Sequence, residues 1–287
     1  MNPTHTNTAA ARTFSVDTTS PGVSLTGAIR SEIVKLNALR TCWWLSVITI
    51  GLGGFMAGVV AFSVQHLMAD NPGSAGDAME VATQGQAGSY FAMFLLGSLG
   101  VIAISTECST GAIRSSVTVV PRRSLLLSAK AVALVMWAAV VAAILVVASH
   151  LLTSFIAESL SPGDIFDAEI AAMYAATWAT VTLTALLGFG LGVLLRSAAG
   201  GIVVLAIILF VMQIVTVILY DITGGAAWVE TLLQVEYTNL VNTLVNPGTG
   251  QGGLIAALEP WQAGIGLLIW VGVPLTLGAL RFTRSDA

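Results

Sequence analysis

Residues 43–64, WWLSVITIGLGGFMAGVVAFSV, decide the fold of this chain. The stretch contains no Asp, Glu, Lys or Arg. A helix of about 20 apolar residues crosses the roughly 30 Å hydrocarbon core of a bilayer. The stretch therefore predicts a transmembrane helix.

Five further runs of this kind follow, and none of them contains a charged residue. They are residues 90–105, 131–152, 171–195, 198–220 and 263–280. Only 9% of all residues are charged and 56% are apolar, whereas about 25% of residues are charged in soluble domains. The mean hydropathy is +0.88. We predict an all-α integral membrane protein with six transmembrane helices.

The charged residues predict how the chain is oriented in the membrane. All 11 Lys and Arg residues lie before the first run, between the second and third, between the fourth and fifth, or after the sixth. Eleven of the 15 acidic residues lie in the other three connecting segments, which contain no basic residue. Because basic loops stay on the cytoplasmic side, we expect both termini and the basic loops to be cytoplasmic.

The segment before the first run divides into two parts. Residues 1–26 are rich in Thr, Ser and Ala, a composition that predicts a disordered cytoplasmic tail, and residues 27–287 form the membrane domain. Within 27–41, apolar residues recur at helical spacing beside several cations, which predicts an interfacial helix on the inner surface. Glu32 and Arg40 interrupt the apolar face of this helix. An extension of the first membrane helix is the alternative.

The loop after the second run, residues 104–130, reads ISTECSTGAIRSSVTVVPRRSLLLSAK. Ile113, Val117 and Val120 share one helical stripe, and Gly111 and Pro121 mark its ends. The pattern predicts a short amphipathic helix at the cytoplasmic surface, suited to contact with a soluble partner.

The last outer segment, residues 221–262, has apolar residues at spacings of three, four and seven. These spacings predict one or two short amphipathic helices before the sixth span. A simple surface loop is the alternative.

Residues for catalysis are scarce. A Walker A loop requires Gly-Lys-Ser/Thr, but Lys35 precedes Leu36 and Lys130 precedes Ala131, so we expect ATP hydrolysis on another polypeptide. His150 is the one histidine that an intramembrane serine protease could use. Gln213 is the most polar side chain inside the spans, and either a hydrogen bond between helices or contact with a substrate would explain it. We predict no enzyme activity, no metal site and no cofactor.

Four segments together resemble a known family. Residues 104–130 combine a carboxylate, a Thr-Gly turn, an Ile-Arg pair and Pro-Arg-Arg. The others are SEIVKLNALRTCWW at 31–44, LGVLLRSAAGG at 191–201 and RFTRSDA at 281–287. In this order, from about residue 28 to the end, they resemble the permease subunits of ABC-2 type transporters, similar to type V exporters and especially to the actinobacterial kind.

The resemblance implies specific partners and contact residues. It implies an interfacial helix, a coupling helix between spans two and three, and a short outer helical element before span six. Two permease subunits, identical or related, would lie in the lipid bilayer, and each would bind a separate ATPase in the cytoplasm. No nucleic acid is an expected partner. The implied ATPase contacts are Glu107, Gly111, Arg114, Arg122 and Arg123, and Glu32 and Lys35 belong to the interfacial helix. Each of these arginines could instead anchor lipid headgroups.

We therefore expect the permease subunit of an ATP-driven exporter in a bacterial plasma membrane. A channel or facilitator that works without a partner is one alternative, and a non-transport assembly or sensory component is another. Neither the substrate nor the choice between a homodimer and a heterodimer follows from the sequence.

Overall fold

The computed structural model describes residues 24–70, 77–110, 123–247, 255–256 and 258–284. These residues form helices and connecting turns, without a strand among them. The helices are α1 (Leu25–Ala38), α2 (Arg40–Asp70), α3 (Ala78–Gly85), α4 (Ser89–Thr110), α6 (Arg123–Ile156), the 3-10 helix η1 (Pro162–Phe166), α7 (Ala168–Leu195), α8 (Ala198–Ala206), the π-helix η2 (Ile207–Val211), α9 (Met212–Ile222), α10 (Ala227–Val235), α11 (Tyr237–Val245) and α12 (Pro260–Arg284).

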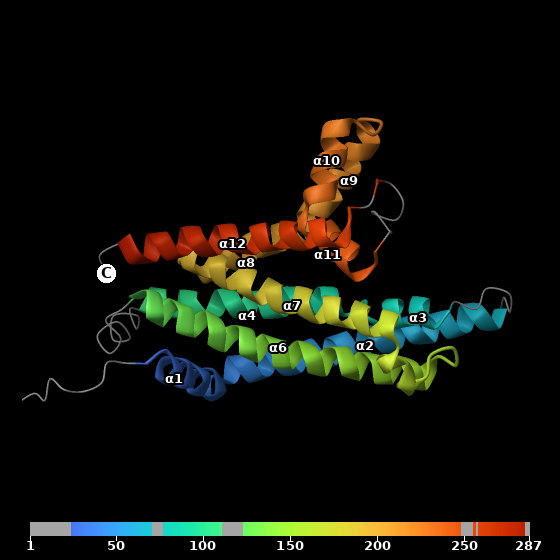
Figure 1. Cartoon of the computed structure of the whole chain (residues 1–287), viewed down its shortest axis with the longest axis horizontal. Helices are drawn as coiled ribbons and strands as arrows, with labels where there is room; N and C mark the ends of the chain where they lie inside the picture. Colours follow the sequence, from blue (N-terminus) through green and yellow to red (C-terminus); the bar gives the residue numbers. More distant parts are fainter. Residues whose placement is uncertain (1–23, 71–76, 111–122, 248–254, 257, 285–287) are drawn as a thin grey trace, which may run out of the picture.

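Six of the described helical segments are long and apolar enough to cross a membrane, which confirms the predicted number. They are α2, α4, α6, α7, the continuous run from α8 to α9, and α12. In Figure 1, α2, α4, α6, α7 and α12 run side by side as a bundle. The central helix is α7, which packs against α4, α6 and α12.

Threonines of α7 can lie inside the bundle because their hydroxyls are hydrogen-bonded within the helix. Thr177 donates to the Met173 carbonyl oxygen at 3.0 Å, and Thr184 donates to that of Thr180 at 2.7 Å. Such bonds satisfy a hydroxyl where no water is available. The predicted span therefore tolerates its many threonines.

Glycines let α4 and α7 approach closely. A Cβ atom on Gly188 would overlap the Gly97 carbonyl oxygen, and one on Gly192 would lie 2.8 Å from the Val101 carbonyl oxygen. In contrast, a Cβ on Gly54 of α2 would meet no atom within 4 Å. The glycine pair of the fourth predicted span therefore serves packing within one subunit.

The connection between the first two spans, residues 65–89, contains a helix, although Pro72, Gly73 and Gly76 in its sequence predict irregular structure. Asp77 caps α3 by accepting a hydrogen bond from the Glu80 backbone nitrogen at 2.8 Å. Val81 and Ala82 are buried in a small apolar cluster with Val146 and Leu160. The cap and this buried face make the helix stable, so an irregular loop was the wrong prediction for residues 78–85.

Helix α1 is a helix of its own and does not extend α2. The residue between them, Leu39, is extended with φ −83° and ψ 112°, and α1 packs mainly against α6. Ser24 caps the first turn, so the helix begins two residues before the predicted boundary at residue 27. Residues 1–23 of the predicted tail lie outside the described residues.

The fifth span bends at a π-helical turn. Helix α8 lies along the bundle, whereas α9 turns away from it and α10 runs back beside α9 (Figure 1). The Leu209 carbonyl oxygen in the π-turn accepts a hydrogen bond from Thr238 Oγ1 at 3.2 Å. We call α9 and α10 together the α9–α10 arm.

The segment before the sixth span contains two short helices, α10 and α11, as its apolar spacing predicts. Helix α11 packs against α7 and α12. Tyr237 is fully buried there and its hydroxyl lies 2.6 Å from Thr184 Oγ1. Burial raises the pKa of the Tyr237 hydroxyl above its usual value. The alternative of a simple surface loop is wrong for residues 227–245.

Candidate functional site

The basic residues of the described chain gather at one end of the bundle. Figure 1 places α1, the start of α2, the start of α6, the α7–α8 junction and the end of α12 at this end, and these segments hold every described Lys and Arg. We call it the basic end. The opposite end, with α3 and η1, is the acidic end.

A buried ion-pair cluster joins three helices at the basic end. Lys130 Nζ of α6 lies 2.7 Å from Glu32 Oε2 of α1 and 2.6 Å from Glu107 Oε1 of α4. Glu32 Oε1 is also 2.6 Å from Lys35 Nζ. We call these four residues the Lys130 cluster. Its two carboxylates and two ammonium groups balance in charge.

Burial distinguishes the two lysines of the cluster. The Lys130 side chain is 5% exposed and that of Glu32 is 8% exposed, whereas that of Lys35 is 43% exposed. Charge-assisted hydrogen bonds of this kind are strong where water is excluded, and removing one member leaves a buried charge without compensation. Lys130 is therefore the residue on which the cluster depends.

Helical spacing places Glu32 and Lys130 in the cluster. Ala28, Glu32 and Leu36 recur every four residues and form the buried face of α1. On α6, Leu126, Lys130 and Leu134 recur in the same way and are buried together. Each helix therefore carries one charge on an otherwise apolar face, and the two charges neutralise each other.

The cluster leaves one carboxylate oxygen unsatisfied. Glu107 Oε2 is buried and has no hydrogen-bond partner among the described residues. It borders a cavity of about 30 Å³, lined also by Leu36, Ala103 and Phe189. This volume exceeds the roughly 10–15 Å³ that one water molecule needs, so a water molecule can bond to the free oxygen.

Three of the predicted site residues meet in this cluster, namely Glu107, which the resemblance implies as an ATPase contact, and Glu32 and Lys35 of the interfacial helix. Lys130 is a cluster member that sequence reasoning missed, although its place on an apolar stripe of α6 was a usable signal. Arg123 is the first residue of α6 and is half-buried. Gly111, Arg114 and Arg122, together with the predicted coupling helix, lie outside the described residues.

The position of the cluster relative to the connecting loop is its main functional feature. Residues 111–122 connect α4, which ends at Thr110, to α6, which begins at Arg123. Glu107 lies three residues before Thr110 and Lys130 lies seven residues after Arg123. Their ion pair therefore holds the two helices together where the loop leaves and re-enters the bundle, and Glu32 attaches α1 at the same point.

His150 has partners that do not suit protease chemistry. The ring is fully buried, with Nδ1 2.7 Å from the Tyr174 hydroxyl and Nε2 3.3 Å from the Pro162 carbonyl oxygen. Neither ring nitrogen contacts a serine in the described part of the chain. No group of three potential metal ligands occurs among the residues that the structure describes.

Comparison with known proteins identifies the family. A family model described as ABC-2 family transporter protein matches residues 28–287, which include all six spans and the Lys130 cluster. No curated protein matches the chain. The chain therefore belongs to the ABC-2 transporter family and is a multi-pass membrane permease component of an ABC transporter.

Proposed function

We propose that this chain is the permease subunit of an ATP-driven exporter in a bacterial plasma membrane, with its basic end in the cytoplasm. A separate ATPase would bind at that end, around residues 111–122, and a second permease subunit would complete the transporter. The observation that carries this proposal is the Lys130 cluster, which clamps α1, α4 and α6 where this loop joins the bundle.

The cluster and the packing beside it offer a route for mechanical coupling. A partner that moves the loop would move α4 and α6 together, because Glu107 and Lys130 connect them. The backbones of α4 and α7 are in turn in close contact at Gly97 and Gly188, because neither glycine has a side chain that would separate them. Packed elements of this kind transmit displacement because they deform little. A displacement of the loop would therefore be transmitted to α7 at the centre of the bundle.

The chain contains no Walker A Gly-Lys-Ser/Thr, which supports the proposal that the partner hydrolyses ATP. Arg122 and Arg123 would contribute to the contact with this partner, since they stand where the loop meets α6. Export is the direction that the family resemblance favours.

Affinity purification tests the proposal. We expect the tagged chain, extracted gently from its native membrane, to co-purify in stoichiometric amounts with a cytosolic-type protein that has a Walker A loop. Replacing Arg122 and Arg123 with Glu should release this partner, because the reversed charges repel its docking surface. The measurement is the partner's yield by quantitative mass spectrometry.

Arg284→Glu is the matched control, because Arg284 is an exposed basic residue at the same end of the bundle. It should leave the partner bound. An Arg122→Glu/Arg123→Glu protein that is folded and keeps both its ATPase and its transport activity would contradict the docking site. Solute flux into vesicles that contain this chain alone, without ATP, would instead indicate a facilitator.

A further inference from the structure

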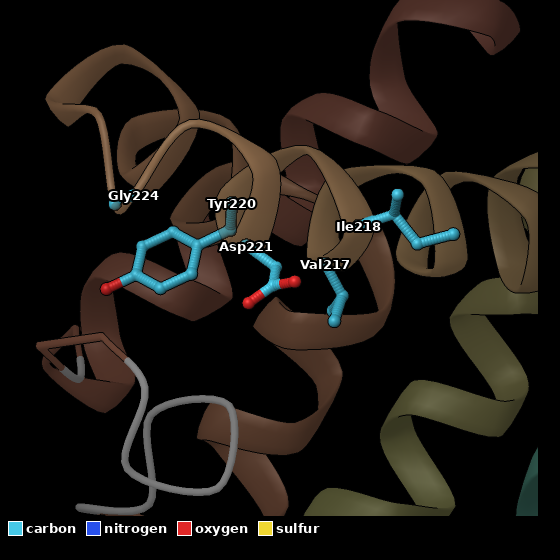
Figure 2. A pocket seen from close by; sticks show the side chains of 6 residues that line it. Val217, Ile218, Tyr220, Asp221 and Gly224 are labelled. Atoms are coloured by element: carbon cyan, nitrogen blue, oxygen red, sulfur yellow. The ribbon is translucent and has the colours of Figure 1, made fainter.

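An open cavity of about 430 Å³ lies at the end of α9, where the chain turns towards α10 (Figure 2). It is lined by Val217, Ile218, Tyr220, Asp221, Gly224 and Gly225. Sites for small molecules commonly measure about 300–1,000 Å³. The cavity is therefore large enough for a small amphipathic molecule.

Two glycines shape one side of this cavity. Gly224 and Gly225 adopt φ values of +63° and +78°, which other residues rarely adopt. They turn the chain from α9 towards α10 without adding side chains to the space. A Cβ atom on Gly225 would lie 3.3 Å from the Tyr220 hydroxyl oxygen, so the turn also leaves room for the tyrosine ring.

The polar groups of the cavity suit a cation. Figure 2 shows the Tyr220 ring and the Asp221 carboxylate projecting from the same side of α9. Asp221 is exposed, and its carboxylate makes no hydrogen bond or ion pair with another described residue. An aromatic ring attracts organic cations through its quadrupole, and the carboxylate supplies the opposite charge.

Gln213 extends this face towards the bundle. Gln213, Val217 and Tyr220 are spaced by four and three residues, so they share one face of α9. The Gln213 side chain is half-buried and makes no hydrogen bond to another described residue. The expected bond between helices is therefore not found in the described structure, and the amide oxygen remains available to a ligand.

The α9–α10 arm carries acidic side chains and no basic one. Two further carboxylates occur on or beside α10, those of Glu230 and Glu236, and Thr216 Oγ1 donates to Glu236 Oε2 at 2.6 Å. The described Lys and Arg residues all belong to the basic end. The local field therefore favours cations and opposes anions.

We propose that this cavity binds organic cations with an apolar body, and that such amphipathic cations are the substrate class of the permease. The Asp221 carboxylate pairs with the cationic centre, Tyr220 stacks on it, and Val217 and Ile218 contact the apolar part. Binding follows from the cavity itself, whereas the role as substrate site rests on the proposed transport function.

Two probe ions of nearly equal size and opposite charge test the proposal. Tetraphenylphosphonium and tetraphenylborate are each equilibrated with the full chain in lipid nanodiscs, and bound ligand is measured by equilibrium dialysis against empty nanodiscs. We expect saturable binding of the phosphonium ion at one site per chain and no saturable binding of the borate. Asp221→Asn should weaken phosphonium binding about tenfold, the effect of losing about 1.4 kcal/mol of ion pairing.

Glu230→Gln is the matched control, because it removes one negative charge from the same arm outside the cavity lining. It should change the affinity less than about twofold, the result expected when charge acts only from a distance. If Asp221→Asn and Glu230→Gln weakened phosphonium binding equally, the effect would come from general surface charge, and this result would overturn the proposed site. Saturable binding of both ions, or affinity unchanged by Asp221→Asn in a protein of unchanged melting temperature, would also overturn it.

This experiment separates the inference from the exporter proposal, because binding requires no ATPase. A chain that binds phosphonium through Asp221 but has no ATPase partner would keep the site and lose the exporter. A chain with an ATPase partner and no Asp221-dependent binding would keep the exporter and lose the site.

Discussion

Replacing Lys130 with methionine should lower the free energy of unfolding by about 3–5 kcal/mol, the cost of breaking a buried ion pair by removing one partner. Methionine has a similar length but no charge, so the carboxylates of Glu32 and Glu107 would remain buried beside each other without a cation between them. We expect a clearly lower melting temperature in mild detergent. We also expect loss of ATPase-driven transport, because Lys130 would no longer connect α6 to α1 and α4 beside the loop.

Lys35→Met is the control for this prediction. Lys35 pairs with the same Glu32 but is 43% exposed, and exposed pairs contribute about 0–1 kcal/mol. The melting temperature of the Lys35→Met protein should therefore stay close to that of the wild type. Adding Glu107→Gln to Lys130→Met should restore part of the lost stability. Glu107 pairs with Lys130 in the described structure, whereas Glu32 keeps its pair with Lys35, so the second substitution removes the uncompensated charge. If Lys130→Met melts like the wild type, the cluster does not hold the three helices together.

Replacing Gly188 with alanine should destabilise the bundle by about 3 kcal/mol, the upper part of the range for overpacking. The new methyl group would overlap the Gly97 carbonyl oxygen, and backbone atoms of α4 cannot move aside as a side chain can. The two central helices would have to separate, losing contacts along their length. Unfolding by denaturant in a fixed detergent measures the effect.

Gly54→Ala is the matched control, a change of the same size inside another span. No atom lies within 4 Å of the added methyl group, so the change in stability should be within about 0.5 kcal/mol. Equal effects of the two substitutions would mean that alanine acts on helix propensity or on the lipid contact. The close approach of α4 and α7 would then contribute nothing specific.

Local sequence features determined the membrane architecture. The six spans follow from runs such as residues 43–64, since each helix must satisfy its own backbone and cover it with apolar side chains. The two short helices before the last span follow from apolar spacing, which is also a property of a single segment. Glu32 and Lys35 could be placed in the candidate site because they lie within a matched family segment.

Other features depend on contacts between residues far apart in the chain. The sequence shows Glu32 on an apolar face, yet it does not say which cation neutralises it. Its buried partner Lys130 is 98 positions away. The α3 helix was missed because its stability comes from burying Val81 in a cluster with residues of α6 and α7, in addition to the local cap at Asp77.

The sequence by itself determined that six segments are long and apolar enough to cross a membrane, that the chain contains no Gly-Lys-Ser/Thr of a Walker A loop, and which segments resemble an ABC-2 permease. Only the tertiary structure decided that α1, α4 and α6 are clamped by Lys130, that the fifth span bends at a π-turn, and that Tyr220 and Asp221 share a cavity. Hydrophobic length and motif order can be read along one segment. Charge compensation, close helix packing and cavities exist only after segments meet in space.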